Sequence, residues 1–322
     1  MHYGPGRTGY QPNETRIGTG NVSQLAQVRT YHAAAYLSAP LIANGVLYVD
    51  TGKLYAFDAT GATGATKCST APVTCTPLWT APTAYFDGMT IANGDVYVTD
   101  GEGVQAFDAA GSKNCSGTPK VCAPLWTAAT SNSPTYSAPA VANGTVYVGS
   151  WNSKLYAFNA AGSTNCSTSA TGKTCRPLWT ATTPTSIGGT PAVANGVVYT
   201  VSGNGTLSAF NAAGSTNCSG TVTAKTCTPL WRSAPGTSGY ATSSSPAVAN
   251  GVVYFSSTNG GTYGYDAAGS LNCSVSGTAK TCSPLWGAVT SFTGGGSPAI
   301  VNGVLYINVS GNGTIYAYSL TA

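Results

Sequence analysis

Asn-Gly dipeptides recur six times along the chain, and each is followed by a short segment in which apolar and polar residues alternate. They begin at Asn44, Asn93, Asn143, Asn195, Asn250 and Asn302, so that successive copies lie 49, 50, 52, 55 and 52 residues apart. Asn-Gly suits tight hairpin turns because both positions tolerate positive φ. A repeat of this length that contains several short strands is typical of a β-propeller, in which each repeat forms one blade. The sequence therefore predicts an all-β propeller.

The third copy divides into four antiparallel strands by its alternation and turn residues. We expect these strands at 138–142, 146–149, 155–158 and from 177 onward. A long loop is expected between the third and fourth strands. The fourth begins with Pro177, which suits an edge strand because proline cannot donate a ladder hydrogen bond.

Aromatic side chains are expected to fill the space between neighbouring blades. The first strand of each copy holds small residues that suit a crowded axis, whereas a Pro-Leu-Trp segment opens the fourth strand of five copies. Each large aromatic side chain gains about 2–3 kcal/mol when it is buried, which favours a role in the core. The tryptophans are Trp79, Trp126, Trp179, Trp231 and Trp286.

The two ends of the chain determine the predicted number of blades. The last copy stops after its third strand, near Tyr318, and no PLW segment follows it. Residues 25–30 (LAQVRT) stand where PLWTA stands in the other copies. We therefore predict six four-stranded antiparallel blades, with the N-terminal strand completing the last blade and closing the ring, which leaves no open sheet edge. Residues 23–322 would form this single domain, and residues 1–22 an extension that wraps around it.

Ten cysteines fall into five local pairs, each within one loop between a third and a fourth strand. Metal ligation is the rival explanation, but the pairs have no CxxC spacing and the only histidines are His2 and His32. Disulfides are favoured, and they indicate a secreted or cell-surface protein, with a thiol-rich cytosolic protein as the alternative. The predicted pairs are Cys68 with Cys75, Cys115 with Cys122, Cys166 with Cys175, Cys218 with Cys227, and Cys273 with Cys282.

Charge and hydropathy argue against nucleic-acid binding and against a membrane span. Only 7% of the residues are charged and the formal net charge is +4, which argues against nucleic-acid binding. No apolar run is long enough to span a membrane. No basic segment followed by an apolar stretch opens the chain, so the printed sequence is expected to start at a processed or artificial N-terminus.

The repeat motifs SPAVANGVVY, LYAFDAAG and PLW, together with RTGYQPNE at residues 7–14, resemble the bacterial pyrroloquinoline-quinone-like (PQQ-like) propeller repeat. The resemblance covers nearly the whole chain. It implies either a quinoprotein dehydrogenase or a non-catalytic scaffold, such as the lipoprotein that assists outer-membrane barrel assembly. Fold analogy alone does not choose between these functions.

The residues favour the non-catalytic scaffold. A quinoprotein dehydrogenase resembles this fold but has adjacent cysteines at the cofactor and an acidic cluster for Ca²⁺, whereas this chain has no adjacent cysteines and only nine acidic residues. We therefore expect no catalytic residue and no cofactor, with PQQ and Ca²⁺ as the alternative. Asp100 and Glu102 form a weak candidate cation site, for which a solvated turn is the simpler explanation.

Aromatic residues occur in the loops that lead from one blade's outer strand to the next blade's first strand. A ring of these side chains around the channel mouth would stack on a sugar or hold an apolar peptide. The alternative is that they only cover the centre of the ring. The predicted functions are binding of a glycan or protein partner, or self-association. The candidate residues are Tyr36, Tyr85, Phe86, Tyr136, Ile187, Tyr240 and Phe292.

Overall fold

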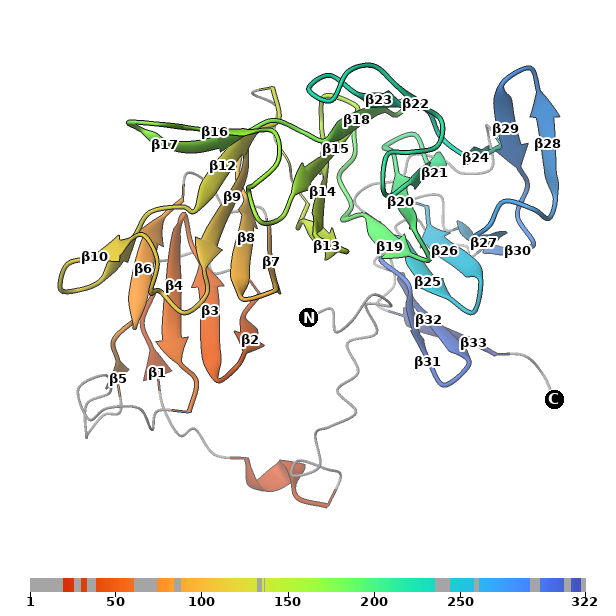
Figure 1. Ribbon diagram of the computed structural model, residues 1–322. Coiled ribbons are helices and arrows are strands. Elements are labelled where there is room, and N and C mark those ends of the chain that lie inside the picture. The colour runs from red at the N-terminus through yellow and green to blue at the C-terminus, as the bar shows by residue number, and fades with distance from the viewer. Residues whose placement is uncertain are drawn as a thin grey trace.

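The fold consists almost entirely of short β-strands, as predicted (Figure 1). The computed structural model describes residues 20–25, 30–33, 39–60, 74–83, 88–131, 135, 137–234, 244–257, 261–289, 296–309 and 314–319. Within these ranges the only helix is the 3₁₀ turn η1 (Val22–Gln24). The boundary between an extension at 1–22 and a domain at 23–322 stays a prediction, because residues 1–19 lie outside the described ranges.

Each repeat forms one blade of antiparallel strands. The first strands are β2 (Leu41–Ala43), β7 (Gly88–Ala92), β13 (Ala140–Ala142), β19 (Ala192–Ala194), β25 (Ala247–Ala249) and β31 (Ala299–Val301). The second strands are β3 (Val46–Asp50), β8 (Asp95–Thr99), β14 (Thr145–Ser150), β20 (Val197–Val201), β26 (Val252–Ser256) and β32 (Val304–Val309). The third strands are β4 (Lys53–Asp58), β9 (Gly103–Asp108), β15 (Lys154–Asn159), β21 (Leu207–Asn211), β27 (Gly261–Asp266) and β33 (Thr314–Ser319). The fourth strands are β6 (Trp79–Pro82), β12 (Trp126–Ala129), β18 (Trp179–Thr182), β24 (Trp231–Ser233) and β30 (Trp286–Val289).

The Asn-Gly turns join first and second strands, as the sequence predicts. Asn143 and Gly144 have φ values of 48° and 73°, and the other five Asn-Gly pairs also lie at positive φ. These are the conformations that a tight hairpin requires. First strands of successive blades contact one another, so the blades converge on their small-residue strands.

The cysteine loops are short hairpins that cross to the neighbouring blade. Their strands are β10 (Cys115–Ser116) with β11 (Val121–Cys122), β16 (Cys166–Ser169) with β17 (Gly172–Cys175), β22 (Cys218–Ser219) with β23 (Thr226–Cys227), and β28 (Cys273–Ser276) with β29 (Ala279–Cys282). The second strand of each hairpin pairs in parallel with the fourth strand of the preceding blade, for example β23 with β18. The prediction that the fourth strand is the edge of its blade is therefore wrong for β6, β12, β18 and β24.

Disulfides close four of these hairpins as predicted. They join Cys115 to Cys122, Cys166 to Cys175, Cys218 to Cys227, and Cys273 to Cys282. In the first repeat, Cys75 in β5 (Thr74–Cys75) is disulfide-bonded, and its predicted partner Cys68 lies outside the described residues. Each disulfide thus holds together a hairpin that bridges two blades.

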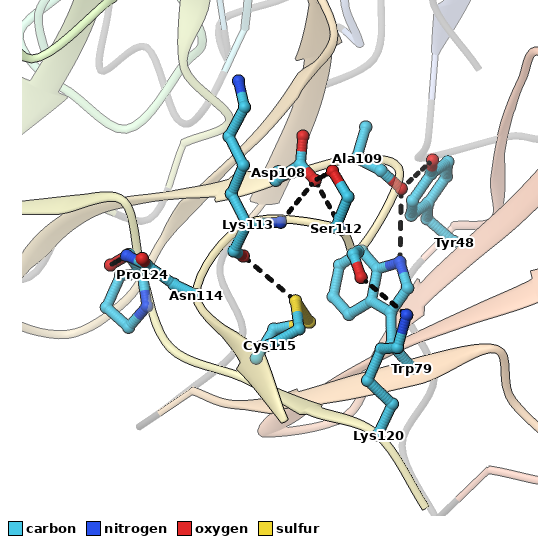
Figure 2. The surroundings of a disulfide bond; sticks show 12 residues. Tyr48, Trp79, Asp108, Ala109, Ser112, Lys113, Asn114, Cys115, Lys120 and Pro124 are labelled. Carbon is cyan, nitrogen blue, oxygen red and sulfur yellow. Dashed lines mark hydrogen bonds between the residues drawn. A yellow bond between two sulfur atoms is a disulfide. The ribbon is translucent and has the colours of Figure 1, made fainter. Parts of the chain in front are cut away.

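A repeated joint connects each blade to the next. Figure 2 shows the first of these joints, in which the Tyr48 hydroxyl and the Trp79 indole N–H both donate to the carbonyl of Ala109, at 2.9 and 3.2 Å. The carbonyls of Ala160, Ala212 and Ala267 each accept the corresponding tyrosine and tryptophan bonds in the following joints. Burial raises the pKa of Tyr48 to about 12, so this hydroxyl stays protonated and remains a donor.

The tryptophans of the first four blades are buried as predicted, since Trp79, Trp126, Trp179 and Trp231 are each 1% exposed. Trp286 differs, because 36% of its surface is exposed. In the described residues no cysteine hairpin covers β30, which explains the difference.

A closed ring of six blades is not shown by the structure. The N-terminal strand β1 (Thr30–Tyr31) pairs in parallel with β5, and the last described sheet contains only β31, β32 and β33. Figure 1 shows β1 and β33 well apart, at the two ends of an arc of sheets. The two-residue strand β1 is attached to the first blade through the cysteine segment, which is the physical reason that it stays there.

Candidate functional site

The candidate site lies at one end of the blades, which we call the connecting-loop face. In the third blade, Ser150 pairs with Lys154, and Lys154 pairs with Thr182. The end of the second strand, the start of the third and the end of the fourth therefore meet there. Turns between second and third strands and the loops that lead to the next blade share this face.

Most of the predicted aromatic ring falls outside the described residues. This applies to Tyr36, Tyr85, Phe86, Tyr136, Tyr240 and Phe292, so their role stays a prediction. Ile187 is described and buried: its amide donates to the Ser150 carbonyl at 3.0 Å, and its side chain packs on Gly149. A β-carbon at position 149 would overlap Ile187, so this loop lies tightly on β14.

The structure adds Trp151 to the connecting-loop face. Trp151 follows β14 and is 54% exposed, unlike the tryptophans of the blade joints. Sequence reasoning missed it, although a signal exists: in the matching Ser-x-Asn segments at 202–204 and 257–259, the middle residue is Gly203 or Thr258. A tryptophan that departs from the repeat has no role common to all blades, which makes it a candidate for function.

Hydrogen-bonded polar side chains hold the turn that contains Trp151. The Asn152 side-chain amide donates to the Thr130 carbonyl at 2.9 Å and to the Tyr156 hydroxyl at 2.7 Å. The Tyr156 hydroxyl lies 3.4 Å from the Ser131 hydroxyl, and Ser131 adopts a positive φ of 59°. These bonds connect the β14–β15 turn to the loop that follows β12. An exposed indole on a turn fixed by these bonds, in a face that also carries the Ser131 hydroxyl, is suited to a ligand with both an apolar face and polar edges.

The weak cation candidate is accounted for by hydrogen bonds within its own turn. Asp100 Oδ1 accepts from the amides of Glu102 and Gly103 at 3.0 and 2.9 Å, and Oδ2 accepts from the Gln105 side chain at 2.6 Å. This arrangement is an Asx turn that needs no ion. Within the described ranges, no group of three or more His, Cys, Asp or Glu residues is placed to hold a metal.

Asp50 is a second buried carboxylate near this face among the described residues. Its Oδ1 accepts hydrogen bonds from the Gly52 amide at 2.8 Å and the Thr83 hydroxyl at 3.0 Å. Burial raises the pKa of Asp50, and these hydrogen bonds only partly offset that effect. The carboxylate therefore joins the β3–β4 turn to the end of β6.

The repeat pattern identifies the family. The family profile described as outer membrane protein assembly factor BamB matches residues 32–168 and, in a second overlapping match, residues 123–322. The chain belongs to this family of PQQ-like repeat proteins. A search of curated proteins gave no match.

Solved structures support a BamB-like fold. BamB from Moraxella catarrhalis is 16% identical, with a TM-score of 0.57 over 88% of this chain and 69% of that one. The computationally designed Ika8 protein is 9% identical, with a TM-score of 0.64 over 91% of this chain and 74% of that one. At these identities the likeness shows the fold alone. Together with the family match, it confirms the predicted PQQ-like repeat family and a propeller-like fold.

The disulfides and the absence of a long apolar helix among the described residues bear on the compartment and on membrane spanning. Four disulfides between described cysteines are in keeping with an extracellular or periplasmic protein. Among the described residues, no helix has the length and hydropathy needed to cross a membrane.

Proposed function

We propose that this protein is a secreted, non-catalytic scaffold that binds a glycan on its connecting-loop face. The observation that carries the proposal is Trp151, an exposed indole at a position where the repeat has Gly203 or Thr258. The family description names an assembly factor, which favours binding over catalysis for the scaffold as a whole.

The chemistry beside Trp151 favours a sugar. An indole face stacks on the C–H groups of a pyranose ring, while fixed amide and hydroxyl groups bond its hydroxyls. Ser131 supplies an exposed hydroxyl that lies 3.4 Å from the Tyr156 hydroxyl, and the bonds of Asn152 to Thr130 and Tyr156 hold the turn that carries Trp151. Because these groups are ordered before binding, little entropy is lost when the ligand docks.

Trp151→Ala should weaken glycan binding by about tenfold or more, because a central aromatic anchor commonly contributes at least about 2 kcal/mol to an interface. The measurement is binding to an array of neutral, N-acetylated and acidic oligosaccharides, followed by titration of the best one. Trp286→Ala is the matched control, since it removes an indole at the opposite end of a blade, away from the connecting-loop face.

Three outcomes would contradict the glycan proposal: no oligosaccharide binds, Trp286→Ala weakens binding as much as Trp151→Ala, or Trp151→Ala leaves the affinity unchanged. If no oligosaccharide on the array binds, but a polypeptide binds and Trp151→Ala abolishes that binding, the face belongs to a protein partner instead.

The same proposal includes closure of the six blades into a ring through β1. The pairing of β1 with β5 repeats the register of the other blade boundaries: Tyr31 pairs with Cys75 as Ala181 pairs with Cys227 and Ser233 with Cys282. By this register, β1 has the place of a fourth strand whose own blade precedes the first.

Contacts of Tyr31 support that assignment. Its ring lies 5.3 Å from Phe57, where the joints of other blades place a tryptophan against the corresponding aromatic, such as Trp179 against Phe210. Its hydroxyl donates to the Asp58 carbonyl at 3.1 Å and lies 3.4 Å from the Ala59 carbonyl. Ala59 corresponds to Ala109, whose carbonyl accepts the bonds of the first joint. Tyr31 corresponds to Ala181 by register, but its ring and hydroxyl make the contacts that a tryptophan makes in the other joints.

The last blade has the matching unfilled side. Ile315 in β33 is 69% exposed, whereas Leu54 and Leu155 at the same position are fully buried. Tyr306 is 37% exposed, whereas Tyr48 and its counterparts in the next three blades are no more than 2% exposed. Docking of β1 beside β33 would bury both side chains, and this apolar burial favours closure.

A cysteine pair tests closure. Tyr55 pairs with Thr80 and Tyr156 with Thr180, so a closed ring places Thr30 opposite Tyr316. Thr30→Cys with Tyr316→Cys should form a disulfide within one chain, detected by non-reducing peptide mapping. Thr30→Cys with Ile315→Cys is the control, because Ile315 points to the other face of the strand. If neither pair forms a crosslink, the ring does not close, since cysteines more than about 7 Å apart cannot be bridged.

A further inference from the structure

The outer side of β30 is the exposed strand edge of the fifth blade. The fifth sheet runs β25-β26-β27-β30 and has no further strand among the described residues, whereas β6, β12, β18 and β24 each carry a cysteine hairpin. Leu285, Trp286 and Val289 are 41, 36 and 74% exposed. Exposed apolar strand edges are usually paired or covered in native proteins.

The edges of β6, β12, β18 and β24, which cysteine hairpins cover, show what kind of segment can pair with β30. A segment binds in parallel, and its carbonyls accept the outward amides of the fourth strand: Thr80 donates to Lys120, Thr180 to Lys225, and Ala234 to Cys282. The second cysteine of every described hairpin packs into the cluster of the preceding blade's tryptophan, as Cys227 does with Trp179. The occupant therefore needs a buried apolar residue at the cysteine position.

Residue spacing identifies that position in the N-terminal segment. In each repeat with a cysteine pair, the second cysteine lies six residues before the residue that corresponds to Tyr31. For example, Cys175 lies six residues before Ala181. Six residues before Tyr31 is Leu25, which lies in the described segment with η1. Leu25 is 64% exposed there, and no residue of η1 is buried. A three-residue 3₁₀ helix without buried side chains has little to stabilise it.

We infer that residues 22–25 leave the 3₁₀ turn and dock in parallel on β30 as its fifth strand, with Leu25 against Trp286. This inference rests on the proposed closure through β1, because the fourth strand of the last blade follows directly in sequence. In this register Leu25 lies opposite Ala288, the Gly287 amide donates to the Ser23 carbonyl, and the Val289 amide donates to the Leu25 carbonyl. The N-terminal segment thereby replaces the cysteine hairpin that the sixth repeat lacks.

Hydrogen exchange at two amides tests the docking. In the full chain the Gly287 and Val289 amides should exchange slowly, and Leu25→Asp should speed both by about tenfold or more, because a charge cannot be buried against Trp286. Val22→Asp is the matched control: its counterparts in the hairpins, Gly172 and Ala279 among them, are exposed, so protection should persist. Fast exchange in the unmodified chain, or equal effects of the two variants, would overturn the inference.

A second cysteine pair separates this inference from ring closure. Leu25→Cys with Ala288→Cys should crosslink within one chain under oxidising conditions. If Thr30→Cys with Tyr316→Cys forms its disulfide and this pair does not, the ring closes but residues 22–25 do not dock on β30. A crosslinked dimer would assign the edge to a second copy of the chain and would equally overturn docking within one chain.

Discussion

Trp179→Ala should lower the free energy of unfolding by about 3–5 kcal/mol, the range for deletion of a large buried aromatic side chain. Trp179 is 1% exposed, packs on Phe210 with ring centroids 6.4 Å apart, and donates its indole N–H to Ala212 at 3.2 Å. The substitution leaves a cavity between two blades and removes one of the two donors to that carbonyl.

Urea unfolding of the oxidised protein, followed by far-ultraviolet circular dichroism, measures this loss. Trp151→Ala is the matched control, because it deletes the same side chain from a site that is 54% exposed and should cost less than about 1 kcal/mol. Equal losses for the two variants would contradict the assignment of Trp179 to the joint between blades.

Gly214→Ala should be the second severe substitution, with an expected loss of about 2–4 kcal/mol from backbone strain and overpacking together. Gly214 has a φ of +63°, and a β-carbon there would overlap the indole of Trp179. Glycine is thus needed both for the turn after β21 and for the close approach of that turn to the preceding blade. The same overlap exists between Gly111 and Trp79, Gly162 and Trp126, and Gly269 and Trp231.

Gly196→Ala separates the two causes. Gly196 also has a positive φ, +76°, but no atom lies within 4 Å of an added β-carbon, so only backbone strain of about 1–2 kcal/mol is expected. In a Trp179→Ala background, the loss from Gly214→Ala should fall to the level of Gly196→Ala, because the overlapping ring is gone. If the loss stays the same in both backgrounds, the indole does not set the requirement for glycine.

The candidate site was predicted only in part. Loops that carry aromatics were assigned to one face, and the register of the third blade places the β14–β15 turn on that face. Ile187, which was predicted at the mouth, is buried on Gly149, and Trp151 was not predicted at all. Whether an aromatic side chain packs inward or remains exposed depends on the neighbouring loops, and a single sequence does not specify these contacts.

Features within one repeat followed from the sequence alone. Asn-Gly turns require only local backbone preferences, strand alternation requires only one buried face, and cysteines seven or nine residues apart meet within one hairpin. Contacts between repeats were decided by the tertiary structure: the parallel pairing of β23 with β18, the shared carbonyl of Ala212, and the parallel pairing of β1 with β5. Because the copies are nearly equivalent, one sequence pattern permits pairing within a copy or with either neighbour, and only packing in three dimensions selects among them.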